Sequence, residues 1–309
     1  MINNICGLIL YSKSEKDLNP EKDYSVTRLL EVARSRNIDI KIVRPDQFEL
    51  VITRSDTKSI LIDDKPEKLP DFVIPRMGSC TTYYAFSVIR QLQYLGVYVC
   101  NDADAISAVK DKLYMHQLLS RSKLSSPRTM LAKYPISIDV VKREIGFPLI
   151  IKNVTGTHGS GIYLCERESD FIDIMELIYI NNNKANIILQ EFIKNSHGKD
   201  LRVFIVGGKV VGCMQRQSES GFKANFSRGG SVLPYEITPE IEWLSTETAK
   251  LFDLDIAGID LLFDESEFKI CEANSSPGFL GMEKVVGKVI AEKIIDYILV
   301  RIGLNAEVN

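Results

Sequence analysis

The sequence predicts an α/β fold that becomes α+β in its C-terminal half. Over residues 5–43, an apolar strand-like run, a helical pattern and a second strand-like run follow one another, and this alternation favours a parallel sheet. Over residues 201–216, two apolar runs are joined by Gly207-Gly208, a dipeptide that favours a tight antiparallel hairpin. A glycine-rich stretch over 152–161 lies between these two regions. Together the three observations predict an N-terminal parallel α/β domain followed by antiparallel sheets.

The first hundred residues repeat the strand–helix alternation. Val26, Leu29 and Leu30 recur at helical spacing, which indicates a helix, and Gly96 ends a second helical pattern. No Gly-x-Gly-x-x-Gly follows the first strand, so the sequence disfavours a dinucleotide site. The expected strands lie at 5–11, 39–43, 71–75 and 98–100, and the expected helices at 23–35 and 83–95.

The remaining residues predict a mixed and then mainly antiparallel arrangement. The glycine-rich stretch is flanked by strands and lacks the Gly-Lys-Ser/Thr ending, so it is not a Walker P-loop. The expected helices lie at 103–121, 138–144, 169–180, 239–252 and 284–303, and the expected strands at 148–153, 162–165, 187–193, 201–206, 209–216, 256–263 and 268–274.

Composition excludes several classes of protein. With 309 residues, the chain is long enough for two domains or three small ones. A formal net charge of −3 disfavours nucleic acid as a direct partner, and the apolar runs are far shorter than the ~20 residues that a membrane-spanning helix needs. The six cysteines and three histidines lack the spacing of zinc or thiol-catalytic sites. We interpret the N-terminal run as a strand rather than a signal peptide, and we expect a cytoplasmic protein.

Acidic and amide side chains near the C-terminus form a candidate metal site. Glu272 and Asn274 point the same way because strand side chains alternate faces. Asp260 joins them if the hairpin around Glu265 has an odd-numbered loop that pairs positions 260 and 272. Two carboxylates and an amide oxygen suit Mg²⁺ that carries nucleotide phosphates. The same spacing also fits an acidic hairpin that faces solvent.

The glycine-rich stretch and several basic residues are candidates for binding anions. Backbone N–H groups of the glycine loop can approach a polyphosphate closely, with Lys152 as counter-charge, although a hairpin tip has the same composition. Lys112 by itself is a surface lysine by default. Arg216 and Arg228 suit phosphate or carboxylate groups. Asp200 and Arg202 fit a structural strand pair equally well.

Taken in order, these motifs resemble the ATP-grasp carboxylate–amine ligases, and within them the RimK-type glutamate ligases. The resemblance covers nearly the whole chain. Its motifs are Pro75-Arg-Met-Gly78, Lys112, Lys152 before the glycine loop, Gln190-Glu-Phe-Ile193, Asp200-Leu-Arg202, Lys223-Ala-Asn225, Arg228-Gly-Gly, Asp260, Glu272-Ala-Asn-Ser-Ser-Pro-Gly278 and Gly281-Met-Glu-Lys284.

The resemblance implies a role for each matching residue. ATP phosphates are contacted by Lys112, Lys152 and the loop glycines Gly156, Gly159 and Gly161. The adenine is held by Gln190, Glu191, Phe192 and Ile193, the ribose by Asp200, and the transferred phosphate lies near Lys223 and Asn225. The ligands of Mg²⁺ (or Mn²⁺), with two ions, are Asp260, Glu272 and Asn274. The acyl-phosphate is stabilised by Arg216 and Arg228, and Arg76 faces the acceptor substrate.

The resemblance also implies an ATP-grasp fold in three parts and a reaction. The parts are an N-terminal α/β acceptor domain at 1–105, a central lid domain at 106–186 and a catalytic domain at 187–309. The reaction adds L-glutamate to the carboxylate of a peptide or protein C-terminus through an acyl-phosphate, with a ribosomal protein as one acceptor and a homotetramer as the assembly. Three alternatives stay open: a small-molecule or coenzyme carboxylate as acceptor, a phosphotransferase acting on a hydroxyl, and an inactive ATP-binding regulatory protein.

Overall fold

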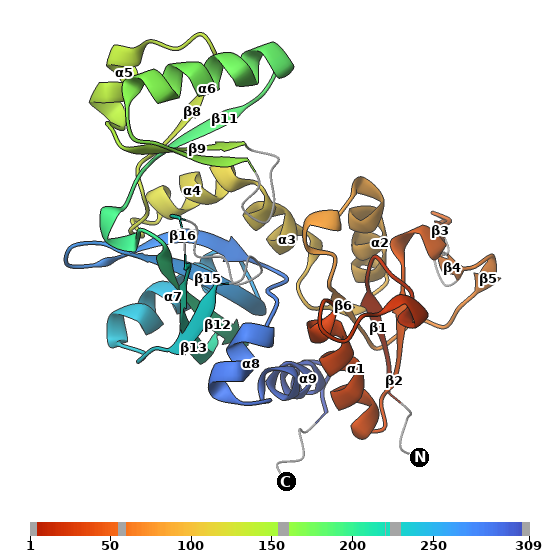
Figure 1. The fold of residues 1–309 in the computed structure, drawn as a ribbon. Coiled ribbons are helices and arrows are strands. Elements are labelled where there is room, and N and C mark those ends of the chain that lie inside the picture. Colours follow the sequence, from red (N-terminus) through yellow and green to blue (C-terminus); the bar gives the residue numbers. More distant parts are fainter. Residues whose placement is uncertain (1–4, 55–59, 154–160, 220, 223–229, 305–309) are drawn as a thin grey trace.

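The computed structural model describes residues 5–54, 60–153, 161–219, 221–222 and 230–304. Within these residues the chain forms three main sheets and one small sheet. Figure 1 shows the N-terminal sheet on the right, the C-terminal sheet on the left and the third, here called the middle sheet, above the latter. None of the helices in this part of the chain is long and apolar enough to span a membrane.

The N-terminal sheet is wholly parallel, in the order β2-β1-β6-β7. Ile9 packs with α1 on one face of the sheet, and Leu8 packs with α2 on the opposite face. Successive strand residues point to opposite sides. This arrangement confirms the parallel α/β part of the predicted fold class. The elements are β1 (Cys6–Leu10), α1 (Tyr24–Ser35), β2 (Asp39–Val43), β6 (Phe72–Pro75), α2 (Tyr83–Tyr94) and β7 (Tyr98–Val99).

A small antiparallel sheet and four short 3-10 helices were not expected from the sequence. Segments of two or three residues are too short to show a hydrophobic period. The strands are β3 (Phe48–Leu50), β4 (Ile60–Ile62) and β5 (Lys65–Pro66), and the 3-10 helices are η1 (Glu15–Asp17), η2 (Pro45–Gln47), η3 (Gly78–Cys80) and η4 (Lys194–Ser196).

The helix expected over 103–121 is wrong in one respect, because Asp111 divides it. α3 (Ala103–Lys110) ends and α4 (Lys112–Arg121) begins at this residue, whose backbone is extended. The Asp111 carboxylate accepts a hydrogen bond from the backbone N–H of Tyr114 at 3.0 Å, which is the ordinary use of aspartate as an N-cap. The break places Lys112 at the first position of a new helix.

The middle sheet is antiparallel, in the order β10-β9-β11-β8. Two helices, α5 (Ile138–Glu144) and α6 (Glu168–Asn181), cover one of its faces (Figure 1). β11 pairs with both β8 and β9, so the sheet extends across the boundary placed at 186 and 187. Its strands are β8 (Thr129–Ala132), β9 (Leu149–Asn153), β10 (Ile162–Cys165) and β11 (Ile187–Glu191).

The C-terminal sheet is also antiparallel, in the order β14-β13-β12-β15-β16. Gly207-Gly208 joins β12 to β13 with both residues at positive φ, as the sequence predicted. β14 was not predicted. The elements are β12 (Lys199–Val206), β13 (Lys209–Gln217), β14 (Ser231–Pro234), α7 (Pro239–Leu251), β15 (Ile256–Phe263) and β16 (Phe268–Asn274).

Two C-terminal helices join the N-terminal and C-terminal sheets. The single helix expected over 284–303 is wrong, because Gly287 has a φ of +82° and separates α8 (Leu280–Val286) from α9 (Ile290–Arg301). α9 lies beside α1 (Figure 1), and its Ile294 shares one apolar core with Leu29 of α1 and Phe204 of β12. The relative position of the two sheets is therefore fixed by packing.

Candidate active site

A cleft of about 890 Å³ lies where the three main sheets meet. It is lined by these residues that the sequence analysis selected: Arg76, Lys112, Lys152, Gln190, Glu191, Phe192, Ile193, Asp200, Arg216, Asp260, Glu272 and Asn274. Gly161 directly precedes Ile162, which also lines the cleft. Gly156, Gly159, Lys223, Asn225 and Arg228 lie outside the described residues.

Asp260 and Glu272 lie directly opposite each other on β15 and β16, but not for the reason expected. The predicted odd-numbered loop is wrong, because Phe263 pairs with Phe268 and the loop 264–267 is even-numbered. A β-bulge shifts the register after Asp260, with Cys271 as the extra residue. Such a bulge re-aims the side chains that follow it. It brings the two carboxylates to one rung of the ladder.

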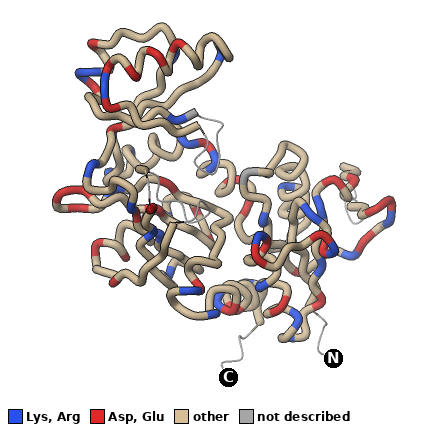
Figure 2. Tube along the Cα trace, viewed as in Figure 1, with Lys and Arg blue, Asp and Glu red and all other residues tan. Residues whose placement is uncertain are grey.

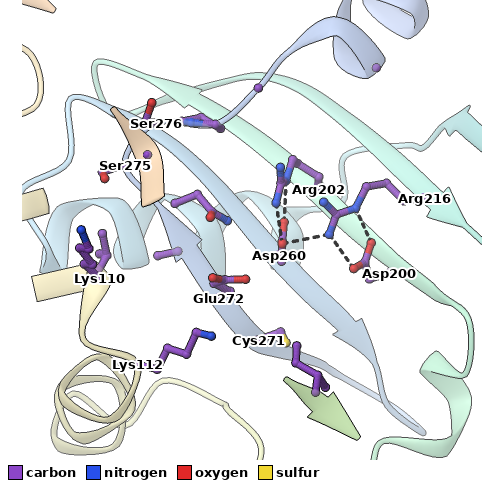
Figure 3. Close-up of a pocket in the computed structure, with 18 of the residues that line it drawn as sticks. Lys110, Lys112, Asp200, Arg202, Arg216, Asp260, Cys271, Glu272, Ser275 and Ser276 are labelled. Atoms are coloured by element: carbon purple, nitrogen blue, oxygen red, sulfur yellow. Dashed lines mark hydrogen bonds and ion pairs between the residues drawn. The ribbon is translucent and has the colours of Figure 1, made fainter. Parts of the chain in front are cut away.

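Asp260 belongs to a buried cluster of two arginines and two aspartates (Figure 3). Arg202 donates to both of its carboxylate oxygens at 2.7 Å, and Arg216 Nη2 lies 2.9 Å from Oδ2. Arg216 also donates to both oxygens of Asp200, at 2.7 and 2.6 Å. Its side chain is only 4% exposed. Such bidentate, charge-assisted bonds are the strong kind, so the cluster holds its members in fixed positions.

The electrostatics of this cluster keep Asp260 ionised. Burial by itself raises the pKa of Asp260, but the two guanidinium groups of Arg202 and Arg216 outweigh it and lower the pKa below its ordinary value. A carboxylate that remains charged in the protein interior is a ready ligand for a cation or a partner for phosphate-bound metal.

Glu272 and Asn274 complete a set of oxygen atoms that fits a hard cation. The Asn274 amide Nδ2 donates to the Gly258 carbonyl at 3.3 Å, which leaves its oxygen available. The Glu272 carboxylate lies in the cleft wall. The described residues contain no group of three or more His, Cys, Asp or Glu side chains that could hold a metal by themselves, so Asp260 and Glu272 would need ligands of other kinds. Two carboxylates and one amide therefore suit Mg²⁺, which takes its other ligands from phosphates and water.

Two lysines, Lys112 (Figure 3) and Lys152, line the cleft near this carboxylate pair and come from other elements. Lys112 opens α4, and burial lowers its pKa although nearby Glu272 opposes the shift. Lys152 lies on β9, and its Nζ is 3.9 Å from Cys271 Sγ. Both ammonium groups can meet an anion bound above Glu272, since an ammonium is a compact point charge.

The chain leaves the middle sheet through the segment 190–193, which forms one wall of the cleft. Gln190 is buried, and its amide Nε2 donates to Thr129 Oγ1 at 2.9 Å and lies 3.0 Å from His116 Nε2. The Glu191 carboxylate pairs with Lys269 and Arg128. Phe192 makes an edge contact with the ring of His197. The segment is thus fixed by polar and ring contacts on several sides.

Arg76 lies on the side of the cleft that the N-terminal sheet provides. It is 7% exposed, its Nη2 donates to the Pro277 carbonyl at 2.7 Å, and its guanidinium lies over the Phe279 ring. Burial lowers the pKa of Arg76 to about 10. No carboxylate of the described residues forms an ion pair with it. A buried cation without an anionic partner favours binding an anion.

Arg202 and His116 are the functional-site neighbours that the sequence reasoning missed. Arg202 belongs to the Asp200-Leu-Arg202 motif, but the sequence assigned it no role beyond an alternative as the structural partner of Asp200; the register of β12 and β15 places it opposite Asp260. Its position two residues after Asp200 puts both on one strand face, so the signal was present. His116 belongs to no recognisable motif, and only its contact with Gln190 in the structure shows that it lies next to the site.

Charged residues of both signs are spread over all three sheets (Figure 2). No basic stripe distinguishes one sheet in that view. In the cleft, by contrast, Asp200, Asp260, Arg202 and Arg216 form ion pairs that share partners.

Comparison with known proteins gives two adjoining family matches. Residues 109–298 match the RimK-like ATP-grasp domain, and residues 18–106 match the RimK pre-ATP-grasp domain. Among curated proteins, the chain is 41% identical over 281 residues to a "probable alpha-L-glutamate ligase" of Methanococcoides burtonii, covering 90% of this chain and 92% of that protein. It is 39% identical to one of the same name from Aliivibrio fischeri, covering 89% and 91%.

Solved structures share the fold at low sequence identity. The ATP-grasp ligase PsnB, in complex with a phosphomimetic variant of its minimal precursor, Mg and ADP, superposes with a TM-score of 0.73 at 18% identity, covering 97% of this chain and 99% of that chain. The D-alanine–D-alanine ligase of Bacillus anthracis superposes with a TM-score of 0.67 at 16% identity, covering 96% and 98%. These likenesses confirm the predicted ATP-grasp fold.

Proposed function

This chain belongs to the RimK-like family of ATP-grasp ligases, and on that premise we propose that it adds L-glutamate to the C-terminal carboxylate of a peptide or protein. The names of its relatives support glutamate as the amino acid. The PsnB complex with a precursor peptide and AMPPNP supports a peptide as acceptor. A ribosomal protein is one acceptor of this kind.

One observation carries the proposal. The paired carboxylates Asp260 and Glu272, the amide of Asn274 and the ammonium groups of Lys112 and Lys152 all line a single cleft. Oxygen ligands beside two lysines match the needs of a metal–nucleotide complex, in which positive charge neutralises phosphate. The alternative interpretation was an acidic hairpin that faces solvent. That alternative does not account for Lys112 and Lys152, which line the same cleft from two other elements.

We propose the nucleotide roles as follows. Lys112, Lys152 and the glycine loop, with Gly156, Gly159 and Gly161, hold the phosphates. The adenine lies against Gln190, Glu191, Phe192 and Ile193, the ribose near Asp200, and the transferred phosphate near Lys223 and Asn225. ATP would then lie between a lid at 106–186 and a catalytic domain at 187–309, with the acceptor against a domain at 1–105.

Asp260, Glu272 and Asn274 would hold Mg²⁺ or Mn²⁺, and we propose two ions. When bound, the metal supplies neutralising charge for the polyphosphate. The contribution of the chain itself is positional: the bulge at Cys271 orients Glu272, and Arg202 and Arg216 hold Asp260.

The reaction then needs no nucleophile from the protein. An acceptor carboxylate oxygen attacks the γ-phosphorus, forming an acyl-phosphate and releasing ADP. The amine of glutamate attacks the acyl carbon, phosphate leaves, and an amide bond remains. Arg216 and Arg228 counter the charge that develops on the phosphoryl oxygens, and the buried cation Arg76 attracts the anionic acceptor.

The test measures ADP release with candidate acceptors, labelled L-glutamate and Mg²⁺, followed by mass measurement of the product. We expect sustained ADP release only when acceptor, amino acid and metal are all present, with a product heavier by one or more glutamate residues. Amidation of the acceptor carboxyl should stop the reaction.

Other outcomes would replace the proposal. If small carboxylic acids or a coenzyme carboxylate are ligated and peptides are not, the acceptor assignment is wrong. If a hydroxyl is phosphorylated without an amine, the protein is a phosphotransferase. Tight ATP binding without turnover, in a broad carboxylate screen, would instead indicate a regulatory protein.

A further inference from the structure

The middle sheet is joined to the rest of the chain by two hinge segments, 122–128 and 192–198. The entering segment contacts the β15–β16 hairpin. The backbone N–H of Ile270 donates to the Ser125 carbonyl at 2.8 Å, and the Ser125 hydroxyl donates to Glu267 at 3.2 Å. The first hinge segment is therefore attached to β16.

The end of β11, where the second hinge segment begins, is attached to the same hairpin through Glu191. Lys269 of β16 donates to Glu191 Oε1 at 2.6 Å, and Arg128 Nε donates to Oε2 at 2.6 Å. The backbone N–H of Glu191 donates to the Arg128 carbonyl at 3.0 Å. Lys269 in turn pairs with Asp264 at 2.9 Å. Glu191 thus links both hinge segments to one strand.

The environment makes this linkage stronger than a surface ion pair. The side chains of Glu191 and Lys269 are 11% and 17% exposed, whereas exposed pairs contribute little because water and salt screen them. The side chain of Arg128 is 64% exposed, so Lys269 is the stronger partner of Glu191. Burial by itself raises the pKa of Glu191, but Lys269 and Arg128 outweigh it and lower the pKa. Each carboxylate oxygen of Glu191 accepts one hydrogen bond, from Lys269 or from Arg128.

Strand β16 contains both Lys269, which binds Glu191, and Glu272, the proposed metal ligand. Lys269 precedes the bulge at Cys271, and Glu272 follows it. On the other side, Lys152 of the middle sheet approaches Cys271 at 3.9 Å. A change in the tilt of the middle sheet must therefore move Lys152 relative to Glu272.

We propose that Glu191, Lys269 and Arg128 form a hinge clamp, which fixes the middle sheet at the tilt that binds ATP. Glu191 and Lys269 are then positioning residues: the adenine lies against the backbone of the segment 190–193, while the Glu191 carboxylate acts on the nucleotide through the hinge. This inference rests on the proposed function, since it takes ATP as the ligand of the cleft.

The test compares the variants Lys269→Met and Glu191→Gln and their combination, with ATP and Mg²⁺ titrated calorimetrically. We expect each single variant to weaken ATP binding about tenfold, on the scale of one charge-assisted hydrogen bond. The double variant should bind no more weakly than the weaker single variant, because both remove the same linkage. Lys269→Arg should restore most of the affinity.

The matched control is Lys142→Met, which breaks the ion pair with Glu168 inside the middle sheet and its helices. It removes a more exposed Lys–Glu pair, with side chains 49% and 39% exposed, that does not touch the hinge, so ATP affinity should remain unchanged. Hydrogen exchange of β9 and β10 should accelerate in the two hinge variants and not in the control. The melting temperatures of all variants serve to exclude general destabilisation.

Two results would overturn the clamp. One is wild-type ATP affinity in Lys269→Met. The other is a loss in Glu191→Gln that greatly exceeds the loss in Lys269→Met and adds to it in the double variant, which indicates direct contact between Glu191 and the nucleotide. If the wild-type protein binds no ATP, the proposed function is wrong, and the hydrogen-exchange comparison still decides whether the clamp holds the sheet.

Discussion

Asp260 and Glu272 face each other across one rung of the β15–β16 ladder, yet their surroundings differ. Asp260 is 5% exposed and bonded to two guanidinium groups. Glu272 is half-buried in the cleft wall. Because one carboxylate is embedded in an ion-pair cluster and the other is not, we expect a different balance of stability and activity when each is removed.

Glu272→Ala should abolish turnover and change the free energy of unfolding by less than about 1 kcal/mol. Asp260→Ala should also abolish turnover, but it should lower the free energy of unfolding by about 3 kcal/mol, since Arg202, whose side chain is only 15% exposed, loses its carboxylate partner. Urea unfolding and ADP release measure the two effects. A Glu272→Ala variant that keeps most of its ADP formation would remove Glu272 from the metal site.

His116 gives a prediction about pH. Burial, and to a lesser extent Lys152, lower the pKa of His116 from 6.5 to about 3. Between these values the unfolded chain binds a proton that the folded chain does not, so the free energy of unfolding falls as the pH falls, by at most about 1.4 kcal/mol per pH unit. Above pH 6.5 the residue has no such effect.

His116→Met should therefore flatten part of this decline. We expect its free energy of unfolding to change less between about pH 6.5 and about pH 5 than that of the wild type. Urea unfolding of both proteins at both pH values measures this change. The contributions of the carboxylates are the same in the two proteins, so they cancel when the changes are subtracted. Equal slopes in the two proteins would show that His116 is accessible to protons in the folded state.

At the scale of elements, the glycine loop depends on the strands that flank it. Gly161 has a φ of +74°, a conformation that disfavours residues with a Cβ. Gly161→Ala should raise the KM for ATP several-fold by displacing the loop, and Lys152→Met should raise it by about tenfold or more through loss of a charge-assisted contact. Steady-state kinetics at saturating acceptor measure both.

Gly208→Ala is the matched control for this effect. Gly208 has the same φ of +74°, lies in the β12–β13 turn, and has open space where a Cβ would be added. Its substitution should impose similar backbone strain without changing the KM for ATP. If both variants raise the KM equally, the effect comes from strain alone and the loop has no special role.

The helix breaks show how much of each element the sequence could predict. The apolar pattern over 103–121 continues through Asp111, so periodicity indicated one helix, although an aspartate at an N-cap was visible. Gly287 ends α8 at a positive φ, two residues before the Val289 N-cap of α9. Periodicity reports which face is buried, while a change of helix axis depends on the elements against which each half packs.

At the scale of the molecule, Asn101 attaches the N-terminal sheet to the C-terminal sheet. Its Nδ2 donates to the carbonyls of Ile256 and Ser275 at 2.7 Å, and its Oδ1 accepts from the Ile256 N–H at 2.8 Å. The residue is 1% exposed. Ser275 follows Asn274 directly, so this contact also holds the end of β16, which carries the proposed metal ligands Glu272 and Asn274.

Asn101→Ala should lower the free energy of unfolding by about 2–4 kcal/mol, because buried backbone groups lose their partners. It should also weaken Mg²⁺–ATP binding through Ser275. Asn181→Ala is the control, since Asn181 is exposed and donates only to the Leu177 carbonyl at 2.7 Å. Denaturant unfolding and calorimetry test the pair, and equal effects of the two substitutions would contradict the bridging role of Asn101.

The sequence by itself determined the type and order of most elements, the ATP-grasp fold through its ordered motifs, and the choice of Glu272 and Asn274 as residues on one strand face. These depend on local periodicity and on residue types within a strand. The tertiary structure decided the rest. The bulge at Cys271 sets the register by an extra residue that no pattern marks, and the pairing of Arg202 with Asp260 depends on which strand becomes the neighbour. The hinge contact of Glu191 with Lys269 joins residues far apart in the chain, and only packing brings them within hydrogen-bonding distance.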